Sequence, residues 1–341
     1  MISATSSMTQ SIQTGFPAIA VSHNTTPFIA AYPWTGAFGT KVANPATLPG
    51  SNGQGVTFTP SGSHIAISYG TSPYISVYPW RGLFGTKVAN AATLVAGSGF
   101  SVAFTPSGDH IAVAHSTTPF ISVYPWTGDF GTKVANPATL PAATGNGVAF
   151  TASGSYIATA EFNSPYVGVY PWNGSFGTRV GNPATLPAGT GRSVAFTPSG
   201  DYIAVGHNTT PYISAYPWTG AFGTKVADPG TLPASTGNGV AFTPSGSYIA
   251  VAHATTPYIA AYPWTGAFGT KVANPATTPS STGSGVAFTS SGDHIAVAHT
   301  GTPFIAVYPW TGAFGTKVAN PAVSPAQAGY NVAFKASTGK Q

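Results

Sequence analysis

Histidines and one glutamate occupy a position that recurs every 46 residues in this 341-residue chain, and they are its first candidates for metal binding. The position holds His23, Tyr69, His115, Glu161, His207, His253 and His299. If each repeat is a small β-sheet in a ring, this position lies on the order of 12 Å from the axis, with neighbouring members about 10 Å apart. Metal ligands must lie about 2 Å from a shared ion. We therefore expect no metal site, and the sequence points to no other cofactor.

Acidic residues are too few and too widely spaced for paired acid–base chemistry. Of the six aspartates and glutamates, three share one turn position in alternate repeats: Asp109, Asp201 and Asp293. Paired carboxylates in glycoside hydrolases are about 5–9.5 Å apart, closer than alternate repeats allow. Arg81, Arg179 and Arg192 fall at three different repeat positions, and no Ser-His-Asp arrangement can be placed. The sequence predicts a protein that is not an enzyme and has no catalytic residues.

The residues that differ between repeats are the candidates for binding. One variable position precedes a recurring Val by two residues and holds Gln54, Phe100, Asn146, Arg192, Asn238, Ser284 and Tyr330. A second follows the histidine position and holds Asn24, Gly70, Ser116, Phe162, Asn208, Ala254 and Thr300. In an antiparallel meander, the loop into the first strand and the loop between the second and third lie on one face. Sequence drift in exposed loops would give the same pattern, so binding and drift both remain open.

The fourth repeat departs from the others beside these positions. Glu161-Phe162-Asn163-Ser164 stands where most repeats read His-x-Thr-Thr. Glu161 and Phe162 therefore join the candidate binding residues. Glu161 could form an ion pair with Arg192 in the loop that leads into the next repeat, or the two could mark a binding spot.

All these residues are positioned by a repeat that has no insertion or deletion. Tyr-Pro-Trp triplets place tryptophans at Trp34, Trp80, Trp126, Trp172, Trp218, Trp264 and Trp310, each 46 residues after the last. A fixed period of this length indicates stacked supersecondary units that share a core. The recurring Tyr, Trp and Phe could form platforms for carbohydrate, but their presence in every repeat favours packing between units.

The third repeat has the pattern of four short antiparallel strands. Runs rich in β-forming residues at 101–105, 110–115, 120–124 and 132–136 are separated by turn sequences. No segment combines helical spacing with capping residues. A unit of four strands in about 40–45 residues is typical of a propeller blade. We predict an all-β fold, a seven-bladed β-propeller of four-stranded antiparallel blades.

The two ends of the array predict how the ring closes. Residues 18–23 match a second strand, and the first strand that should precede them appears instead at 331–334. The C-terminal strand should therefore join the N-terminal blade, which removes open sheet edges. We expect residues 16–337 to form the propeller, residues 1–15 a flexible or docking arm, and residues 338–341 a C-terminal tail.

Charge is sparse and evenly distributed. Charged residues make up 5% of the chain, against roughly a quarter in ordinary soluble domains. Most of the basic residues share one repeat position: Lys41, Lys87, Lys133, Arg179, Lys225, Lys271 and Lys317. A ring with one charge per repeat is no basic patch, so we expect no nucleic-acid binding and interpret these residues as protection of the outer sheet edges. The chain has no apolar run long enough to span a membrane, no visible secretory signal and no cysteine.

The stretch from Val102 to Trp126, VAFTPSGDHIAVAHSTTPFISVYPW, resembles the WD40 repeat over its first three strands. It lacks the Gly-His and the Asp of that family's buried hydrogen-bonded network, so the resemblance implies a WD40-like propeller in which the Trp serves packing. The near-identity of the repeats, with the motif Tyr-Pro-Trp-Thr-Gly-Ala-Phe-Gly-Thr-Lys-Val-Ala-Asn-Pro, also resembles highly repetitive propeller proteins of tailed-bacteriophage virions.

The second resemblance implies a non-enzymatic structural or interaction protein, such as a decoration, fibre or tail-associated subunit of a virion. Its partners would be other virion proteins, or a receptor or glycan on the host surface, bound through one loop face. It would be located in the extracellular particle and, during assembly, in the host cytoplasm. One alternative is a lectin-like propeller in which Phe100, Phe162 or Tyr330 contacts a glycan. Another is a propeller enzyme such as a lactonase or glycosidase. The oligomeric state is left open.

Overall fold

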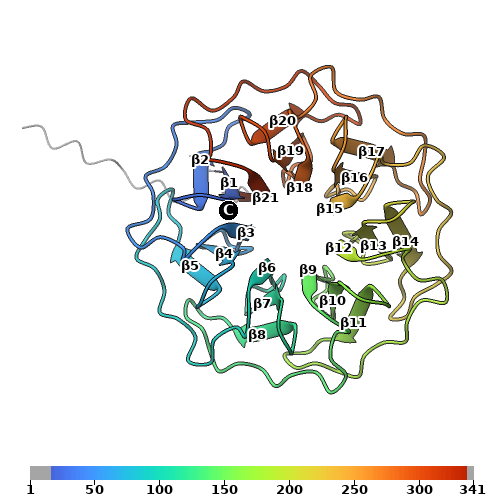
Figure 1. Ribbon diagram of the computed structural model, residues 1–341, viewed down its shortest axis with the longest axis horizontal. Coiled ribbons are helices and arrows are strands. Elements are labelled where there is room, and N and C mark those ends of the chain that lie inside the picture. Colours follow the sequence, from blue (N-terminus) through green and yellow to red (C-terminus); the bar gives the residue numbers. More distant parts are fainter. Residues whose placement is uncertain (1–16, 336–341) are drawn as a thin grey trace, which may run out of the picture.

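The computed structural model describes residues 17–335, which form 21 strands and no helix (Figure 1). The strands make seven three-stranded antiparallel sheets, or blades, arranged in a ring. The innermost strands are β21 (Gly329–Lys335), β3 (Gly53–Phe58), β6 (Gly99–Phe104), β9 (Gly145–Phe150), β12 (Gly191–Phe196), β15 (Gly237–Phe242) and β18 (Gly283–Phe288). The middle strands are β1 (Ala18–His23), β4 (His64–Tyr69), β7 (His110–His115), β10 (Tyr156–Glu161), β13 (Tyr202–His207), β16 (Tyr248–His253) and β19 (His294–His299). The outer strands are β2 (Ile29–Pro33), β5 (Ile75–Pro79), β8 (Ile121–Pro125), β11 (Val167–Pro171), β14 (Ile213–Pro217), β17 (Ile259–Pro263) and β20 (Ile305–Pro309).

The ring closes as the sequence predicts. Strand β21 pairs with β1 in antiparallel register, with Ala333 opposite Ala20 and Phe334 opposite Ile19. The first blade therefore combines the C-terminal strand with β1 and β2, and we number the blades one to seven from it. The seven-bladed all-β fold is confirmed. The predicted N-terminal arm and C-terminal tail lie outside the described residues.

Each blade has three strands where the sequence suggests four. In blade three, the expected fourth strand at 132–136 has no regular strand structure. It makes one ladder-like bond to β8, from Val134 N to the Val123 carbonyl oxygen at 2.9 Å. The chain then reaches Pro137, which has no N–H to donate to a ladder. The outer edge of each blade is therefore covered by an irregular segment. In six of the seven blades a lysine of this segment donates to the side chain three residues later, as Lys41 does to Asn44.

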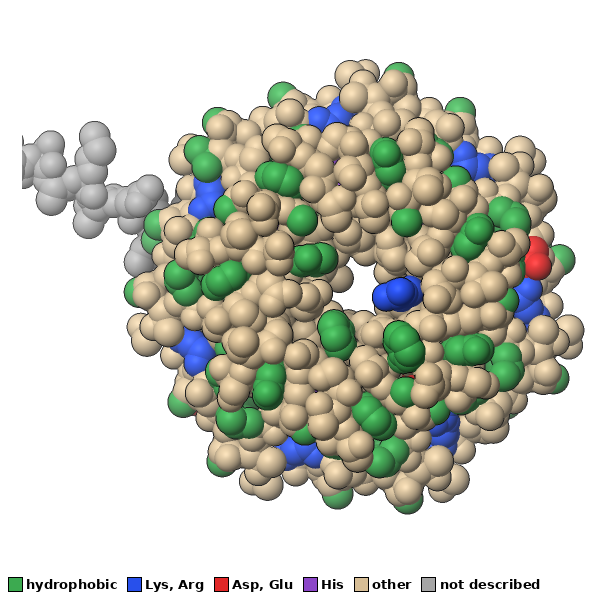
Figure 2. All heavy atoms as spheres, in the orientation of Figure 1, with side chains coloured by type: hydrophobic (Ala, Val, Ile, Leu, Met, Phe, Trp, Pro, Cys, Tyr) green, Lys and Arg blue, Asp and Glu red, His purple; other side chains and the backbone are tan. Residues whose placement is uncertain are grey.

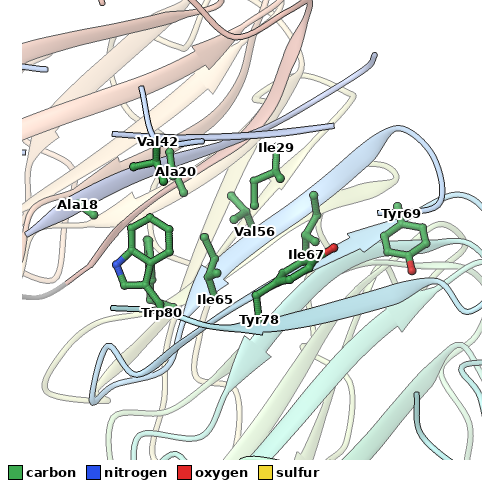
Figure 3. Close-up of a cluster of buried hydrophobic side chains, with 12 residues drawn as sticks. Ala18, Ala20, Ile29, Val42, Val56, Ile65, Ile67, Tyr69, Tyr78 and Trp80 are labelled. Atoms are coloured by element: carbon green, nitrogen blue, oxygen red, sulfur yellow. The ribbon is translucent and has the colours of Figure 1, made fainter. Parts of the chain in front are cut away.

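The hydrophobic core lies between blades. Each tryptophan is nearly inaccessible to solvent, and Trp126 packs edge-on against Phe130 of its own turn, Phe104 of β6 and His64 of blade two. Figure 3 shows the equivalent cluster at the junction of blades one and two, with Trp80 beside Ile65. Edge-to-face contacts of this kind stabilise aromatic pairs by about 0.5–1.5 kcal/mol beyond burial. The predicted packing role of the tryptophans is confirmed.

The innermost strands of adjacent blades approach each other closely at one level. A Cβ added to Gly147 would lie 3.2 Å from the Ser193 Cα of the next blade, and one on Gly239 would lie 3.0 Å from the Gly285 Cα. In ring order this level holds Gly55, Ser101, Gly147, Ser193, Gly239, Gly285 and Asn331. Every adjacent pair, including the pair that closes the ring, contains at least one glycine. The crowding between two adjacent innermost strands therefore depends on which two residues face each other at this level.

We predict that Gly147→Ser, which puts serines in three consecutive blades, lowers the free energy of unfolding by about 1–3 kcal/mol through overpacking. The same substitution should destabilise less in a chain that also carries Ser101→Gly and Ser193→Gly, because its neighbours are then glycines. Urea denaturation of the single, double and triple variants measures this coupling. Strictly additive effects would contradict pairwise crowding.

Candidate functional site

The first series of variable residues converges on the mouth of the central channel. A cavity of about 890 Å³ opens there, a size suited to a small ligand. All seven members of the series line it: Gln54, Phe100, Asn146, Arg192, Asn238, Ser284 and Tyr330. Three members of the second series line it as well: Ser116, Phe162 and Thr300. We call the first series together with Phe162 the channel mouth.

A β-bulge presents each of the first seven residues. In β12 the ladder to β13 pairs Gly191 with His207 and then Ser193 with Gly206, so Arg192 is the extra, unpaired residue. The same register shift occurs in every innermost strand. A bulge redirects a side chain without interrupting the sheet. The variable residues therefore reach the channel while the ladder around them continues.

A glycine precedes each bulge because the backbone of the preceding blade is close. A Cβ on Gly99 would lie 2.8 Å from the Tyr74 carbonyl oxygen, and one on Gly145 would lie 2.6 Å from the Phe120 carbonyl oxygen. The recurring pattern of Gly, a variable residue, a small residue and Val is thus the sequence signal of the bulge. The variability between repeats identifies the position of the bulge residue, and the recurring pattern around it also explains why the strand bulges there.

The channel mouth combines one cation with uncharged polar groups. Arg192 is exposed, and it is the one charged residue among those that line the cavity. On either side of it, Asn146 Nδ2 donates to the Gly191 carbonyl oxygen at 2.7 Å and Asn238 Nδ2 donates to the Gly283 carbonyl oxygen at 2.9 Å. These bonds use the amide nitrogens and leave the side-chain oxygens as acceptors. Figure 2 shows the opening through the ring, with a basic side chain and several apolar side chains at its edge.

Glu161 lies in the interior, away from the channel mouth. Its side chain is fully buried, and both carboxylate oxygens lie 3.0 Å from Arg179 Nη2. The suggested pair with Arg192 is therefore wrong, and the partner comes from the same blade. Glu161 Oε2 also accepts from Ala142 N at 3.1 Å. Burial raises the pKa of Glu161, and the charge of Arg179 and the N–H of Ala142 oppose that effect.

The residues around Glu161 change together with it. In blade three the corresponding side chains are His115 and Ser122, which hydrogen-bond at 3.0 Å. In blade four Ser122 is replaced by Gly168, where a Cβ would overlap the Glu161 carboxylate. The recurring lysine is replaced by Arg179, whose Nη1 also donates to the Leu140 carbonyl oxygen at 3.0 Å. Glu161, Gly168 and Arg179 thus form one structural unit, and the sequence shows them as three separate departures from the repeat.

The buried histidines do not form a metal site. Residues His23, His115, His207, His253 and His299 are all inaccessible to solvent. No group of three potential ligands that could hold a metal ion occurs in the part of the chain that the structure describes. Desolvation lowers the pKa of each of these histidines to about 4, so they are neutral at pH 7.

A serine, an aspartate and a histidine meet in a turn on the opposite face, but not as a catalytic triad. Asp109 Oδ1 accepts from Ser107 Oγ at 2.6 Å and lies 3.0 Å from His110 Nδ1. In a triad the serine bonds the imidazole, which then takes its proton. Here the serine bonds the carboxylate instead, so the imidazole has no nucleophile to activate. The same arrangement recurs at Asp293 and His294.

Solved structures share this architecture at low sequence identity. A protein from Bacteroides uniformis, assigned as a 6-phosphogluconolactonase, is 16% identical over 94% of this chain and 99% of its own, with a TM-score of 0.69. The periplasmic gluconolactonase of Pseudomonas aeruginosa is 13% identical over 94% and 99%, with a TM-score of 0.70. Hydrazine synthase of Kuenenia stuttgartiensis is 16% identical over 78% of each chain, with a TM-score of 0.62. No protein-family model and no curated protein matches the sequence.

These matches correct the predicted function. Two of the similar structures are lactonases by name, so the prediction of a non-enzymatic virion component is wrong, and the lactonase alternative agrees better with them. At this level of identity the likeness itself shows the shared propeller fold. The predicted binding residues of the channel mouth, and the predicted partners and location, stay predictions.

We predict that Glu161→His alone lowers the free energy of unfolding by about 3–5 kcal/mol, because it leaves the largely buried Arg179 without its carboxylate. Adding Gly168→Ser and Arg179→Lys recreates the blade-three arrangement and should restore most of the loss. Chemical denaturation of the single and triple variants measures both effects. A triple variant no more stable than the single one would show that the three residues are independent.

We also predict that the protein loses stability as the pH falls from about 6.5 to about 4. In this range the unfolded chain protonates histidines of ordinary pKa, whereas the five buried histidines stay neutral in the folded chain. Denaturation curves between pH 7.5 and 4 give the proton uptake on unfolding. His115→Tyr, which copies Tyr69 and its bond to Ser76, should reduce that uptake by about one proton. An unchanged uptake would contradict this assignment.

Proposed function

We propose that the protein is a lactonase-type enzyme that hydrolyses a polar lactone at the channel mouth. The observation that carries the proposal is Arg192, an exposed guanidinium in a cavity otherwise lined by uncharged side chains. No ion pair involves Arg192 within residues 17–335. The shared architecture with gluconolactonase propellers supports the choice of reaction.

Arg192 would act on the lactone carbonyl. When water attacks the carbonyl carbon, negative charge develops on the carbonyl oxygen, and a guanidinium beside it stabilises that charge in the transition state. The ring C–O bond then breaks, one proton of the attacking water passes to the departing ring oxygen, and the other is released to solvent as the resulting hydroxy acid ionises. The carboxylate of that product would also interact with Arg192 until it is released.

Polar and aromatic neighbours would orient the substrate. The amide oxygens of Asn146 and Asn238 are acceptors for substrate hydroxyl groups on either side of Arg192. Phe100, Phe162 and Tyr330 provide apolar ring surface at the cavity wall, and Phe162 is 50% exposed. Such rings bury the C–H surface of a bound ligand while the few polar groups fix its orientation.

The site offers no side chain of the usual kind for a general base. Neither a carboxylate nor an imidazole is among the residues that line the cavity. Catalysis would therefore rest on positioning and on charge stabilisation by Arg192, with hydroxide or water as the nucleophile. The rate should follow the hydroxide concentration and lack the inflection near pH 6–7 that a catalytic histidine produces.

We predict that the protein accelerates hydrolysis of glucono-δ-lactone above the spontaneous rate and that Arg192→Gln lowers kcat/KM by about 10²–10³. Acid release at constant pH measures the rate, and the pH profile should rise without a bell-shaped maximum. Arg81→Gln, at an exposed arginine outside the cavity lining, is the matched control and should leave the rate unchanged. Equal rates for the two variants, or no acceleration of any polar lactone, would overturn the proposal.

A further inference from the structure

Two departures from the repeat lie next to each other at the channel mouth. In the first variable series Arg192 is the one charged residue. In the second series Phe162 is the one large side chain, because the other six members are Asn, Gly, Ser, Ala or Thr. Phe162 belongs to blade four and Arg192 to blade five, the next blade of the ring. One sector of the channel mouth therefore combines a cation with an aromatic ring.

Hydrogen bonds between the two blades hold this sector together. Phe162 N donates to the Thr144 carbonyl oxygen at 2.9 Å, and the Phe162 carbonyl oxygen accepts from Thr190 Oγ1 at 3.0 Å. Thr190 stands two residues before Arg192 in the chain. Asn146 joins the sector, because its Nδ2 donates to the carbonyl oxygen of the residue before Arg192. The loop that carries Phe162 is thus tied to the segments that carry Asn146 and Arg192.

The Phe162 ring faces the cavity and takes no part in the core. Phe162 is 50% exposed and lines the cavity. It belongs to none of the hydrophobic clusters between blades in the described part of the chain. Covering such a ring with apolar ligand surface is favourable, and stacking against a second aromatic ring adds to the gain. Figure 2 shows basic and apolar side chains close together at the opening.

The other residues of the cavity favour one kind of lactone. Hydrolysis expels the ring oxygen, and no carboxylic acid or imidazole is present among the described lining residues to protonate it. The one phenol in the lining, that of Tyr330, belongs to blade one, three blades away from Arg192. A phenoxide is roughly 10⁵-fold less basic than an alkoxide, so it departs without an acid catalyst. This cavity therefore suits an ester of a phenol better than an ester of an aliphatic alcohol.

We propose that the sector formed by Asn146, Phe162 and Arg192 binds benzo-fused lactones, whose ring oxygen is attached to an aromatic carbon, and that Phe162 determines this preference. The lactone carbonyl lies at Arg192, and the benzene ring of the substrate stacks on Phe162. The hydrolytic part of this inference rests on the proposed lactonase function. The binding of an aryl anion does not, because it depends only on the charge of Arg192 and on the exposed ring.

The reaction balances with water as the only co-substrate. Water adds to the carbonyl carbon, the bond from that carbon to the ring oxygen breaks, and the departing phenoxide takes up one proton of the water. The other proton is released as the new carboxylic acid ionises. In the resulting hydroxyaryl alkanoate the carboxylate pairs with Arg192, and the phenol donates to the side-chain oxygen of Asn146.

Two lactones of equal ring size test the substrate class. Dihydrocoumarin and δ-valerolactone are both six-membered lactones, and dihydrocoumarin alone carries a fused benzene ring. We expect the protein to accelerate dihydrocoumarin hydrolysis, relative to the spontaneous reaction, at least about tenfold more than δ-valerolactone hydrolysis. Division by the spontaneous rates removes the higher intrinsic reactivity of the aryl ester.

Variants assign the preference to Phe162. Phe162→Ser, which copies Ser116 of blade three, should lower kcat/KM for dihydrocoumarin about tenfold, mainly through KM, and much less for δ-valerolactone, which has no aromatic face. Phe162→Tyr keeps the ring and should keep the preference. Leu83→Ser is the matched control, since Leu83 is a 55% exposed apolar residue outside the cavity lining, and it should leave both rates unchanged. Melting curves of each variant check that it is folded.

The hydrolysis product tests binding apart from catalysis. In calorimetric titrations of the full chain, 3-(2-hydroxyphenyl)propanoate should bind more tightly than 5-hydroxypentanoate, the product of δ-valerolactone. Phe162→Ser and Arg192→Gln should each weaken the binding of the aryl compound by about tenfold.

The outcomes distinguish this inference from the proposed function. Lactone hydrolysis with no preference for dihydrocoumarin, or with a preference that Phe162→Ser leaves intact, would overturn the inference alone. Binding of the aryl anion that depends on Phe162 and Arg192, without hydrolysis of any lactone, would keep the aryl site and overturn the lactonase. The absence of both binding and hydrolysis would overturn both.

Discussion

The close approach of the innermost strands is the constraint on which the ring depends. Seven sheets meet around one axis, and the strands nearest that axis have the least room. Where the Cα of one blade faces the next at Gly147 and Ser193, a glycine is needed at one side of the contact. The spacing set there determines the gap between blades further out, which Trp126 and its equivalents fill. A wider inner ring would leave those aromatic clusters loosely packed.

Much of the fold follows from the sequence because the repeat exposes it. The 46-residue period gives the number of blades, and the displaced strand at 331–334 gives the closure. The fourth strand was wrongly expected, because a β-rich composition at 132–136 does not reveal that only Val134 finds a ladder partner. Strand composition describes a local preference, whereas pairing depends on a neighbour that the local sequence does not specify.

The candidate site was predictable in position and not in chemistry. Differences between repeats identified the seven bulge residues, because the scaffold residues around them barely change. Glu161 was misplaced by the same reasoning. Glu161 departs from the repeat because its buried carboxylate binds Arg179 and occupies the space beside Gly168. Only the three-dimensional contacts reveal this. The function predicted from the near-identity of the repeats was wrong for a related reason. Near-identical repeats describe the scaffold, and this scaffold is shared by proteins of unlike activity.

The bulge has a consequence for how such a protein can change over time. Its extra residue belongs neither to the hydrogen-bonded ladder nor to the clusters between blades, so a mutation there leaves both intact and removes at most a side-chain bond, such as that from Asn146 to the Gly191 carbonyl oxygen. Gln54, Arg192 and Tyr330 are three different residues that the same bulge holds at this position. The ring therefore separates the residues that stabilise the fold from those that vary around its opening, so the lining of the opening can change, or be redesigned, without renewed selection for folding.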